Sequence, residues 1–426
     1  MILIKNGRVI DPASGTDSVS DVVIDGGVVG RIGAFEYDLA AFSSVIDAEG
    51  MIVAPGLVDV HVHFREPGFT HKEDVFSGAA AAAAGGYTTV VCMANTSPAI
   101  DNPDVLSQAL ATAASAKIHV KVLAAVSEGL SGKRLTDMEL LYSKGAVGFS
   151  DDGHAIMDSN LLLNALSEAK KLGAVVSLHE EDPALIAVPG INAGAVARRL
   201  SLKGAPGVAE SSLVARDCMI ALDTGAKTHF QHLSCAESLA AVKMAKLMGA
   251  RVSAEVTPSH FSLTENAVID TGTLAKVNPP LRSEEDRLAL IDGLREGIID
   301  VIATDHAPHS MGEKRMPFSE APSGIIGLET ALSLGVTYLV RSGALSFAEL
   351  IEKMALAPAR LYGFDAGRLA EGKPADIVVF DGNENRRVSG FLSKSSNSPF
   401  LGKHLWGAVK YTFCGGRLVY QEGQGN

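Results

Sequence analysis

The sequence contains few cysteines. Among its 426 residues there are four, and they form no C-x-x-C pair and no closely spaced group: Cys92, Cys218, Cys235 and Cys414. Cysteines distributed in this way are typical of small buried apolar residues in a reducing cytosol. The sequence therefore predicts neither disulfide bonds nor a thiolate zinc site.

Positive charge is also in short supply. The 37 Lys and Arg residues are outnumbered by 49 Asp and Glu residues, which gives a formal net charge of −12 and a pI near 5.5. Because binding to a nucleic-acid backbone needs a basic surface, we expect no nucleic-acid partner. Any charge on a small substrate must then be met locally.

An export signal and a membrane span are both missing from the sequence pattern. The chain starts directly with a strand-like run, without a basic segment, a long apolar core or a small-residue cleavage site. One apolar stretch, residues 77–94, is long enough to consider, but Gly85-Gly86 interrupts it and a β-type run follows. We expect a helix followed by a strand, in a cytoplasmic protein without membrane contact.

Short β-type runs mark the two ends of the chain, and strands alternate with helices between them. Residues 1–54 predict a small antiparallel sheet, because their β-type runs are broken by Asn-Gly and Asp-Gly-Gly turns. Helical patterns include 160–172, 235–248 and 284–296. Eight strands are predicted near 57–63, 88–93, 118–125, 146–150, 174–179, 227–232, 250–256 and 300–305.

Eight alternating units of this kind, with strands that read as buried on both faces, favour an α/β fold built on a (β/α)₈ TIM barrel over a doubly wound open sheet. No internal repeat supports the count. We expect the barrel at residues 55–365. The β-type runs of 366–426 are predicted to pair with residues 1–54 in a small discontinuous β-sandwich domain.

The first predicted barrel strand ends in His61, His63 and Arg65. Side chains of a strand repeat every two residues, so all three project to the same side. Two imidazoles on one face can bind one metal ion, and Arg65 would place a cation for a substrate carboxylate beside it. The alternative is that both histidines are polar residues of a half-buried strand.

Further ligand-type side chains follow other predicted strands. Active groups of a TIM barrel lie at the C-terminal ends of its strands, where this chain has Asp151-Asp152, His179, His232 and Asp305. Imidazole and carboxylate ligands favour a divalent cation, zinc foremost, and a bridging carboxylate would hold two ions about 3.5–4 Å apart. Apart from His309, we interpret the seven other histidines as surface or structural: His71, His119, His154, His229, His260, His306 and His404.

Two longer motifs resemble the signature stretches of the dihydroorotases, which are members of the amidohydrolase superfamily. They are Asp59-Val-His-Val-His-Phe-Arg-Glu-Pro-Gly68 and Ala303-Thr-Asp-His-Ala-Pro-His309, the second continuing to Lys314. The resemblance extends over nearly the whole chain and fits the longer, type I branch. Shorter matching segments surround Asn95, Asp152, His179, His232, Glu255, Asn278 and Gly372.

This resemblance implies a ligand set for two zinc ions. His61, His63 and Asp305 would hold one ion, His179 and His232 the other, and Asp152 would bridge them. Asp152 is preferred to Asp151 because it lies 27 residues before His179 (179 − 152), as in the family. An aspartate here fits the aspartate-bridged bacterial group rather than relatives that carry a carboxylated lysine.

The resemblance also implies the reaction. Dihydroorotases catalyse the reversible cyclisation of N-carbamoyl-L-aspartate to L-dihydroorotate and water, the third step of pyrimidine synthesis. A hydroxide between the metals would attack the cyclic amide, and Asp305 would act as general base and acid.

Substrate contacts are implied as well. Arg65, Asn95 and His309 would bind the carboxylate beside the metal ligand His63, and Asn278 and the backbone of Ser323-Gly324 would hold the ring amide. Asn95 and Asn278 have an alternative reading as turn formers. The chain departs from the family pattern at Ser259 and Ser323, neither of which is a metal position.

Two other functions compete with this one. An allantoinase or hydantoinase would use the same fold and the same metal chemistry, but Arg65 favours a substrate with a carboxylate. A catalytically inactive scaffold for aspartate transcarbamoylase would lack metal ligands, whereas all six are present. We expect an active enzyme, a homodimer that can also associate with aspartate transcarbamoylase.

Overall fold

Eight short parallel strands form a closed barrel, as the sequence predicts. A computed structural model describes residues 1–423. Hydrogen bonds join successive strands in two runs, β6-β7-β8 and β9-β10-β11-β12-β13. The bridges Ala124 to Phe149 and Val62 to His306 join the two runs and close the ring. The barrel strands are β6 (Leu57–Val62), β7 (Tyr87–Cys92), β8 (His119–Val122), β9 (Gly148–Phe149), β10 (Val175–Leu178), β11 (Lys227–Phe230), β12 (Val252–Val256) and β13 (Val301–Ile302).

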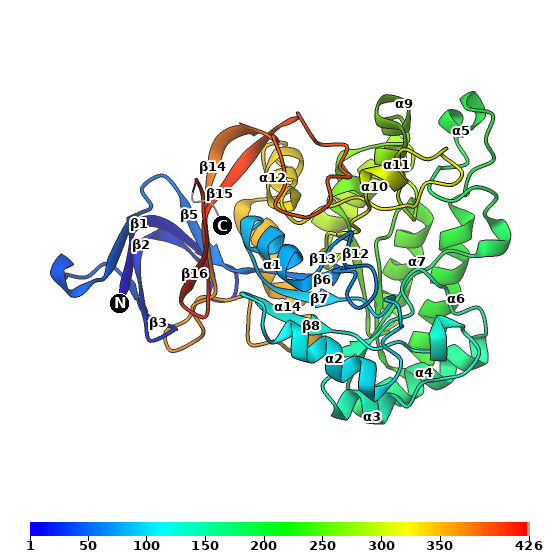
Figure 1. Cartoon of the computed structure of the whole chain (residues 1–426), viewed down its shortest axis with the longest axis horizontal. Coiled ribbons are helices and arrows are strands. Elements are labelled where there is room, and N and C mark those ends of the chain that lie inside the picture. Colours follow the sequence, from blue (N-terminus) through cyan, green and yellow to red (C-terminus); the bar gives the residue numbers. More distant parts are fainter. Residues whose placement is uncertain (424–426) are drawn as a thin grey trace.

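Helices surround the barrel (Figure 1). The three helices that the sequence predicts are confirmed as α4, α7 and α10. In α4, Asp158 caps the first turn and Gly173 ends the helix in a left-handed conformation. The helices are α1 (Val75–Ala84), α2 (Pro103–Ala113), α3 (Met138–Ser143), α4 (Ser159–Leu172), α5 (Ala195–Arg199), α6 (Val208–Thr224), α7 (Ala236–Leu247), α8 (Pro258–Ser262), α9 (Ala267–Thr271), α10 (Glu284–Arg295), α11 (Met311–Lys314), α12 (Ala331–Gly335), α13 (Phe347–Ile351) and α14 (Ala357–Tyr362).

Strands from both chain ends form one eight-stranded sheet at one end of the molecule (Figure 1). Its order is β16-β15-β14-β5-β1-β2-β3, and β4 also pairs with β1. The strands are β1 (Ile2–Asp11), β2 (Thr16–Asp25), β3 (Val28–Gly33), β4 (Ser44–Asp47), β5 (Ile52–Pro55), β14 (Ile377–Arg387), β15 (His404–Cys414) and β16 (Arg417–Gln421).

The N-terminal part of this sheet is mixed, and the expectation that it is antiparallel was wrong for two strands. Tight turns make β1, β2 and β3 antiparallel neighbours, but β4 and β5 run parallel to β1. The cause is the connection through residues 34–43, which carries the chain from β3 to the other side of β1.

The segment between β14 and β15 leaves the sheet and returns to the barrel. There Ser393 donates to Glu73, and the buried Asn397 contacts the loops that follow β13. Residues distant in the sequence thus support the end of the barrel at which its strands terminate.

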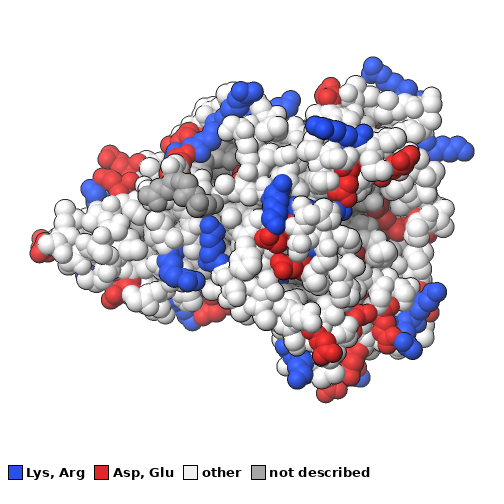
Figure 2. Space-filling model, in the orientation of Figure 1, with Lys and Arg blue, Asp and Glu red and all other residues white. Residues whose placement is uncertain are grey.

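The apolar residues 77–94 fold as expected, into most of α1 followed by β7. No helix within residues 1–423 is long and apolar enough to cross a membrane. On the face shown in Figure 2, Lys and Arg side chains are scattered among Asp and Glu side chains.

Candidate active site

Six buried side chains meet where the barrel strands end. His61 lies in β6, and the other five lie within three residues after the ends of β6, β9, β10, β11 and β13. Because the strands are parallel, their C-terminal ends open on the same side of the barrel. Each of the six residues is at most 8% exposed: His61, His63, Asp152, His179, His232 and Asp305.

Asp152 lies at the centre of this group. Its Oδ1 is 3.3 Å from His61 Nε2, and its Oδ2 is 3.4 Å from His63 Nε2. The same Oδ1 is 3.7 Å from His179 Nδ1 and 3.9 Å from His232 Nε2. One carboxylate therefore faces all four imidazoles.

Asp305 faces the first two histidines only. Its Oδ1 is 3.0 Å from His63 Nε2 and 3.4 Å from His61 Nε2. The six side chains therefore divide into a group around His61, His63 and Asp305 and a pair formed by His179 and His232, with Asp152 between them.

The neighbouring Asp151 points elsewhere. Its Oδ1 accepts the backbone N–H groups of Val126 and Ser127, and its Oδ2 accepts the Ser127 hydroxyl. Of the two adjacent aspartates, only Asp152 lies among the histidines.

The donor set suits divalent metal ions. Imidazole nitrogens and carboxylate oxygens bind zinc. Two overlapping groups of three such atoms each lie within 4.8 Å of one another, one from His61, His63 and Asp305 and one from His61, Asp152 and His232. Asp152 Oδ1 is buried and accepts no hydrogen bond, and His232 Nδ1 likewise has no partner. Buried polar atoms without partners are costly in a folded protein, and a bound cation relieves the cost at Asp152.

The charges in this cluster are strongly coupled. Burial alone would raise the pKa of Asp152, but the facing imidazoles, His61 foremost, hold that pKa well below its ordinary value. Burial lowers the pKa of His232 to about 3, helped by the neighbouring His179 and His61. Burial would also lower the pKa values of His61 and His179, but the facing carboxylates raise the first well above its ordinary value and the second to about 10. A metal ion that binds these two imidazoles must therefore displace their protons.

Two of these side chains project from an unusual backbone. His232 has φ 31° and Asp305 has φ 46°, in the left-handed region that residues other than glycine rarely adopt. Such conformations cost about 1–3 kcal/mol and concentrate at functional sites. They turn the chain sharply at the ends of β11 and β13 and aim both side chains inward.

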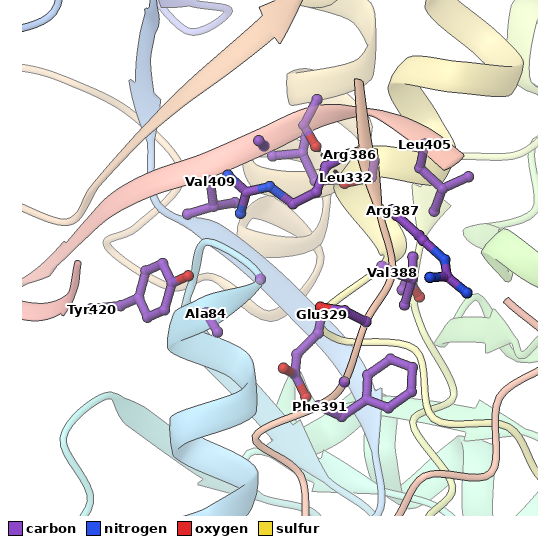
Figure 3. Close-up of a pocket in the computed structure, with 17 residues that line it drawn as sticks. Ala84, Glu329, Leu332, Arg386, Arg387, Val388, Phe391, Leu405, Val409 and Tyr420 are labelled. Carbon is purple, nitrogen blue, oxygen red and sulfur yellow. Dashed lines mark hydrogen bonds between the residues drawn. The ribbon is translucent and has the colours of Figure 1, made fainter. Parts of the chain in front are cut away.

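A cavity of about 210 Å³ lies over the cluster, and all of the predicted site residues except His61 line it. His61 is fully buried beneath it. Arg65, Asn95, Asn278, His309, Ser323 and Gly324 complete the wall. A second cavity of about 170 Å³ lies beside the sheet and includes Glu329, Arg387 and Tyr420, but none of these metal-ligand candidates (Figure 3).

Arg65 and His309 form one side of the first cavity. Arg65 Nε donates to the carbonyl of Pro308 at 3.2 Å, and His309 Nε2 lies 2.9 Å from the carbonyl of Ser323. Burial lowers the pKa of His309 to about 2, so its ring is neutral and carries one proton. Its Nε2 also lies 3.2 Å from Arg65 Nη2, and its Nδ1 lies 3.5 Å from the Lys72 ammonium.

Residues 52–419 match the amidohydrolase family. The chain belongs to the amidohydrolase family. Among curated relatives, it is 54% identical to a dihydroorotase of Clostridioides difficile over 99% of this chain and 100% of the relative. It is 53% identical to a dihydroorotase of Streptococcus thermophilus with the same coverage. These relatives confirm the resemblance found in the sequence motifs.

Solved structures of other amidohydrolases share the fold. An L-hydantoinase from Arthrobacter aurescens is 26% identical, with a TM-score of 0.88 over 99% of this chain and 96% of its own. A dihydropyrimidinase from Brevibacillus agri is 25% identical, with a TM-score of 0.85 over 99% and 95%. The chain is therefore a metal-dependent cyclic amide hydrolase, and its identity to dihydroorotases is about twice its identity to hydantoinases.

Asn95 contributes to this amidohydrolase site by orienting other residues. Its Oδ1 lies 3.0 Å from His63 Nδ1, which must therefore carry the proton, and Nε2 is free to bind metal. Its Nδ2 donates to Asp152 Oδ2 at 2.9 Å. The reading of Asn95 as a turn former misses these contacts.

Two supporting residues were not predicted from the sequence. Glu255 is fully buried in β12 and contacts His61 Nδ1 at 2.6 Å and His229 Nε2 at 2.9 Å, which fixes the His61 ring. A charged residue inside the apolar run of β12 was the available signal. The sequence held no signal for Asn397, because its side chain contacts Gly324 and Ala307, which are 73 and 90 positions away in the chain.

Proposed function

We propose that this amidohydrolase catalyses the reversible conversion of N-carbamoyl-L-aspartate to L-dihydroorotate and water. One observation carries the proposal: a guanidinium, that of Arg65, lines the same cavity as a cluster of histidines and aspartates suited to metal. A cyclic amide that bears a carboxylate satisfies both features. The 54% identity to dihydroorotases over the whole chain supports it.

Two zinc ions fit the six ligands. His61, His63 and Asp305 would hold one ion, His179 and His232 the other, with Asp152 shared. When bound, the ions would polarise the amide carbonyl and lower the pKa of the attacking water. Reconstitution with zinc should approach two ions per chain, and full activity with one ion at saturation would contradict the binuclear site.

Asp305 is the proton carrier in this scheme. Burial would raise its pKa, but the imidazoles of His61 and His63 keep the pKa below its ordinary value, so the carboxylate starts ionised. It accepts a proton from the attacking water and passes it to the departing ring nitrogen during hydrolysis. In the direction of cyclisation the same transfers run in reverse.

Arg65 and His309 would bind the substrate carboxylate next to His63. Arg65 brings a forked, permanently charged donor, and the neutral His309 ring is held between Ser323 and Lys72. Asn95 would support the same contact while it orients His63. Asn278 Oδ1 accepts a hydrogen bond from the Ser323 hydroxyl at 3.0 Å, and this pair with Gly324 would hold the ring amide.

Hydantoinase or allantoinase activity is the competing assignment, since solved hydantoinases share the fold. Hydantoin and allantoin carry no carboxylate, so neither would compensate for burying the Arg65 charge. The test is the rate of ring opening for dihydroorotate, allantoin and hydantoin by the same zinc-loaded protein. Faster turnover of either uncharged ring would overturn the dihydroorotase assignment.

The organisation of the molecule is part of the proposal. We propose domains at 55–365 for the barrel and at 1–54 with 366–426 for the sheet. We propose a cytoplasmic homodimer. Exposed apolar side chains on the neighbouring helices α6 and α7, among them Met219, Met244 and Leu247, are candidates for its interface. We propose that this dimer can also associate with aspartate transcarbamoylase. Light scattering would test the dimer, and co-purification would test the association.

A further inference from the structure

A second group of metal-ligand side chains lies outside the active site, where the sheet meets the barrel. It consists of His119, the first residue of β8, with Asp376 just before β14 and Cys414 at the end of β15. One ligand atom from each lies within 4.8 Å of the other two. His119 Nε2 and Asp376 Oδ2 are 3.2 Å apart.

The fold brings these three residues together from both units. In the antiparallel pair of β14 and β15, Ile377 pairs with Phe413, so Asp376 lies opposite Cys414 one step further along. Strand β7 of the barrel links Cys414 to His119. The Cys414 thiol donates to the carbonyl of Thr88 at 3.7 Å, and the next residue, Thr89, pairs with His119.

Asp376 is held in a fixed orientation. Its Oδ1 accepts the N–H of Gly415 at 2.7 Å, which leaves Oδ2 directed at His119. Its backbone carbonyl accepts the N–H of Gly56, which ties it to the start of β6. Zinc–ligand bonds of about 2.0–2.3 Å place ligand atoms about 3–4 Å apart, so only small side-chain shifts are needed for all three to bind one ion.

The surroundings suit an ion that enters from solvent. Asp376 is 4% exposed and Cys414 is 1% exposed, whereas the His119 side chain is 44% exposed. A simple ion pair would need only His119 and Asp376. With a sulfur donor and an imidazole beside the carboxylate, this set of ligands binds zinc in preference to magnesium or calcium.

We propose that His119, Asp376 and Cys414 form a separate structural site for a zinc-type divalent cation, with a water as fourth ligand. On binding, the Cys414 thiol and His119 release their protons to solvent. The ion joins β8 of the barrel to β14 and β15 of the sheet. The proposal departs from the expectation, based on cysteine spacing, that the chain has no thiolate zinc site.

Cobalt loading tests the site, because sulfur distinguishes it from the active site. Cobalt bound to a thiolate absorbs in the near ultraviolet, whereas cobalt held only by imidazole and carboxylate does not. Within residues 1–423, Cys414 is the one cysteine found in a group of three possible ligands. We expect the thiolate band in the cobalt-loaded protein.

Variants make the test specific. Cys414→Ser and His119→Gln should each lose the band and about one cobalt per chain while keeping dihydroorotate hydrolysis. Cys218→Ser is the matched control, since Cys218 is equally buried and belongs to no such group; it should keep the band. His119 is exposed, so His119→Gln still reports if Cys414→Ser fails to fold. The proposal is overturned if the cobalt-loaded parent lacks the band or if the band survives Cys414→Ser. Either result would show that His119 and Asp376 form an ion pair without a metal.

Discussion

Asp152 shows how far single residues can be predicted. Its choice over Asp151 came from family spacing, and the structure places its carboxylate among the four histidines while Asp151 caps backbone N–H groups. The pairing of His61 with His63 followed from the two-residue period of a strand. Amide contacts such as those of Asn95 depend on which side chains meet across the barrel, and no local pattern encodes them.

Arg65 carries the specificity for a carboxylated substrate. Arg65→Lys keeps the charge but loses the fork and the Nε–H bond to Pro308. We expect kcat/KM for dihydroorotate to fall by a factor that corresponds to the loss of a charged hydrogen bond, about 1.5–3 kcal/mol, with zinc content unchanged. Steady-state kinetics with metal analysis measure this. Arg295→Lys on the exposed face of α10 is the control, and kinetics of Arg65→Lys equal to this control would assign Arg65 to structural support only.

At the scale of elements, short strands place the ligands and long connections complete the cavity. The sequence of residues 309–323 shows no clear helical period, but α11 (Met311–Lys314) occupies part of this connection. Ser310 and Glu313 cap this helix reciprocally, and the Ser-x-x-Glu spacing was a usable signal that the short length of the helix concealed.

Two buried lysines hold this connection in place. Lys314 Nζ donates to the carbonyls of Pro322 at 2.9 Å and Gly324 at 3.1 Å, and Lys276 Nζ donates to those of Phe318 and Ala321. Gly324 itself has φ 146°, and a Cβ there would lie 2.8 Å from the carbonyl of Ala307. The wall that carries Ser323 is therefore built around lysine-to-carbonyl contacts.

Lys314→Met should loosen this wall without touching the metal ligands. The carbonyls of Pro322 and Gly324 would lose a buried donor, so we expect faster hydrogen exchange over 311–324 and a higher KM at unchanged zinc content. Substrate should slow exchange in the parent as the connection closes on it. Lys133→Met, an exposed lysine, is the control. If exchange in Lys314→Met equals that of the parent, the lysine contacts do not hold this wall. If substrate leaves exchange in the parent unchanged, the connection does not close on it.

For the whole molecule, the order of barrel strands was predictable because alternating strands and helices have few ways to close. The path of the C-terminal segment was not, since residues 388–403 leave the sheet and contact the barrel through Ser393 and Asn397. These contacts join parts of the chain more than 70 residues apart. Nothing in their local sequence distinguishes them from an ordinary loop.

Glu329 links this segment to the barrel and gives a pH signature. It accepts the N–H groups of Leu392 and Ser393 beside the second cavity (Figure 3), and burial raises its pKa from 4.5 to about 7. The folded state therefore binds more protons than the unfolded state between these pH values. The contribution of Glu329 to the free energy of unfolding falls as pH rises through this window, by up to about 1.4 kcal/mol per pH unit.

Glu329→Gln removes that dependence. We expect the stability of the variant relative to the parent to increase from pH 4.5 to 7 and to level off above about pH 8. Urea unfolding across this range measures the difference, in which other titrating groups cancel. A difference independent of pH would show that Glu329 is ionised throughout.

The central claim is that Asp305 moves the proton within a metal centre of four histidines and two aspartates. Asp305→Asn keeps the shape of the side chain and an oxygen that can face a metal, but it removes the base. The most direct measurement is dihydroorotate hydrolysis by zinc-reconstituted Asp305→Asn, with bound zinc determined in the same sample. We expect zinc and substrate to remain bound and turnover to fall by about 10²–10⁴-fold; turnover within a few-fold of the parent, at equal zinc content, would contradict the account.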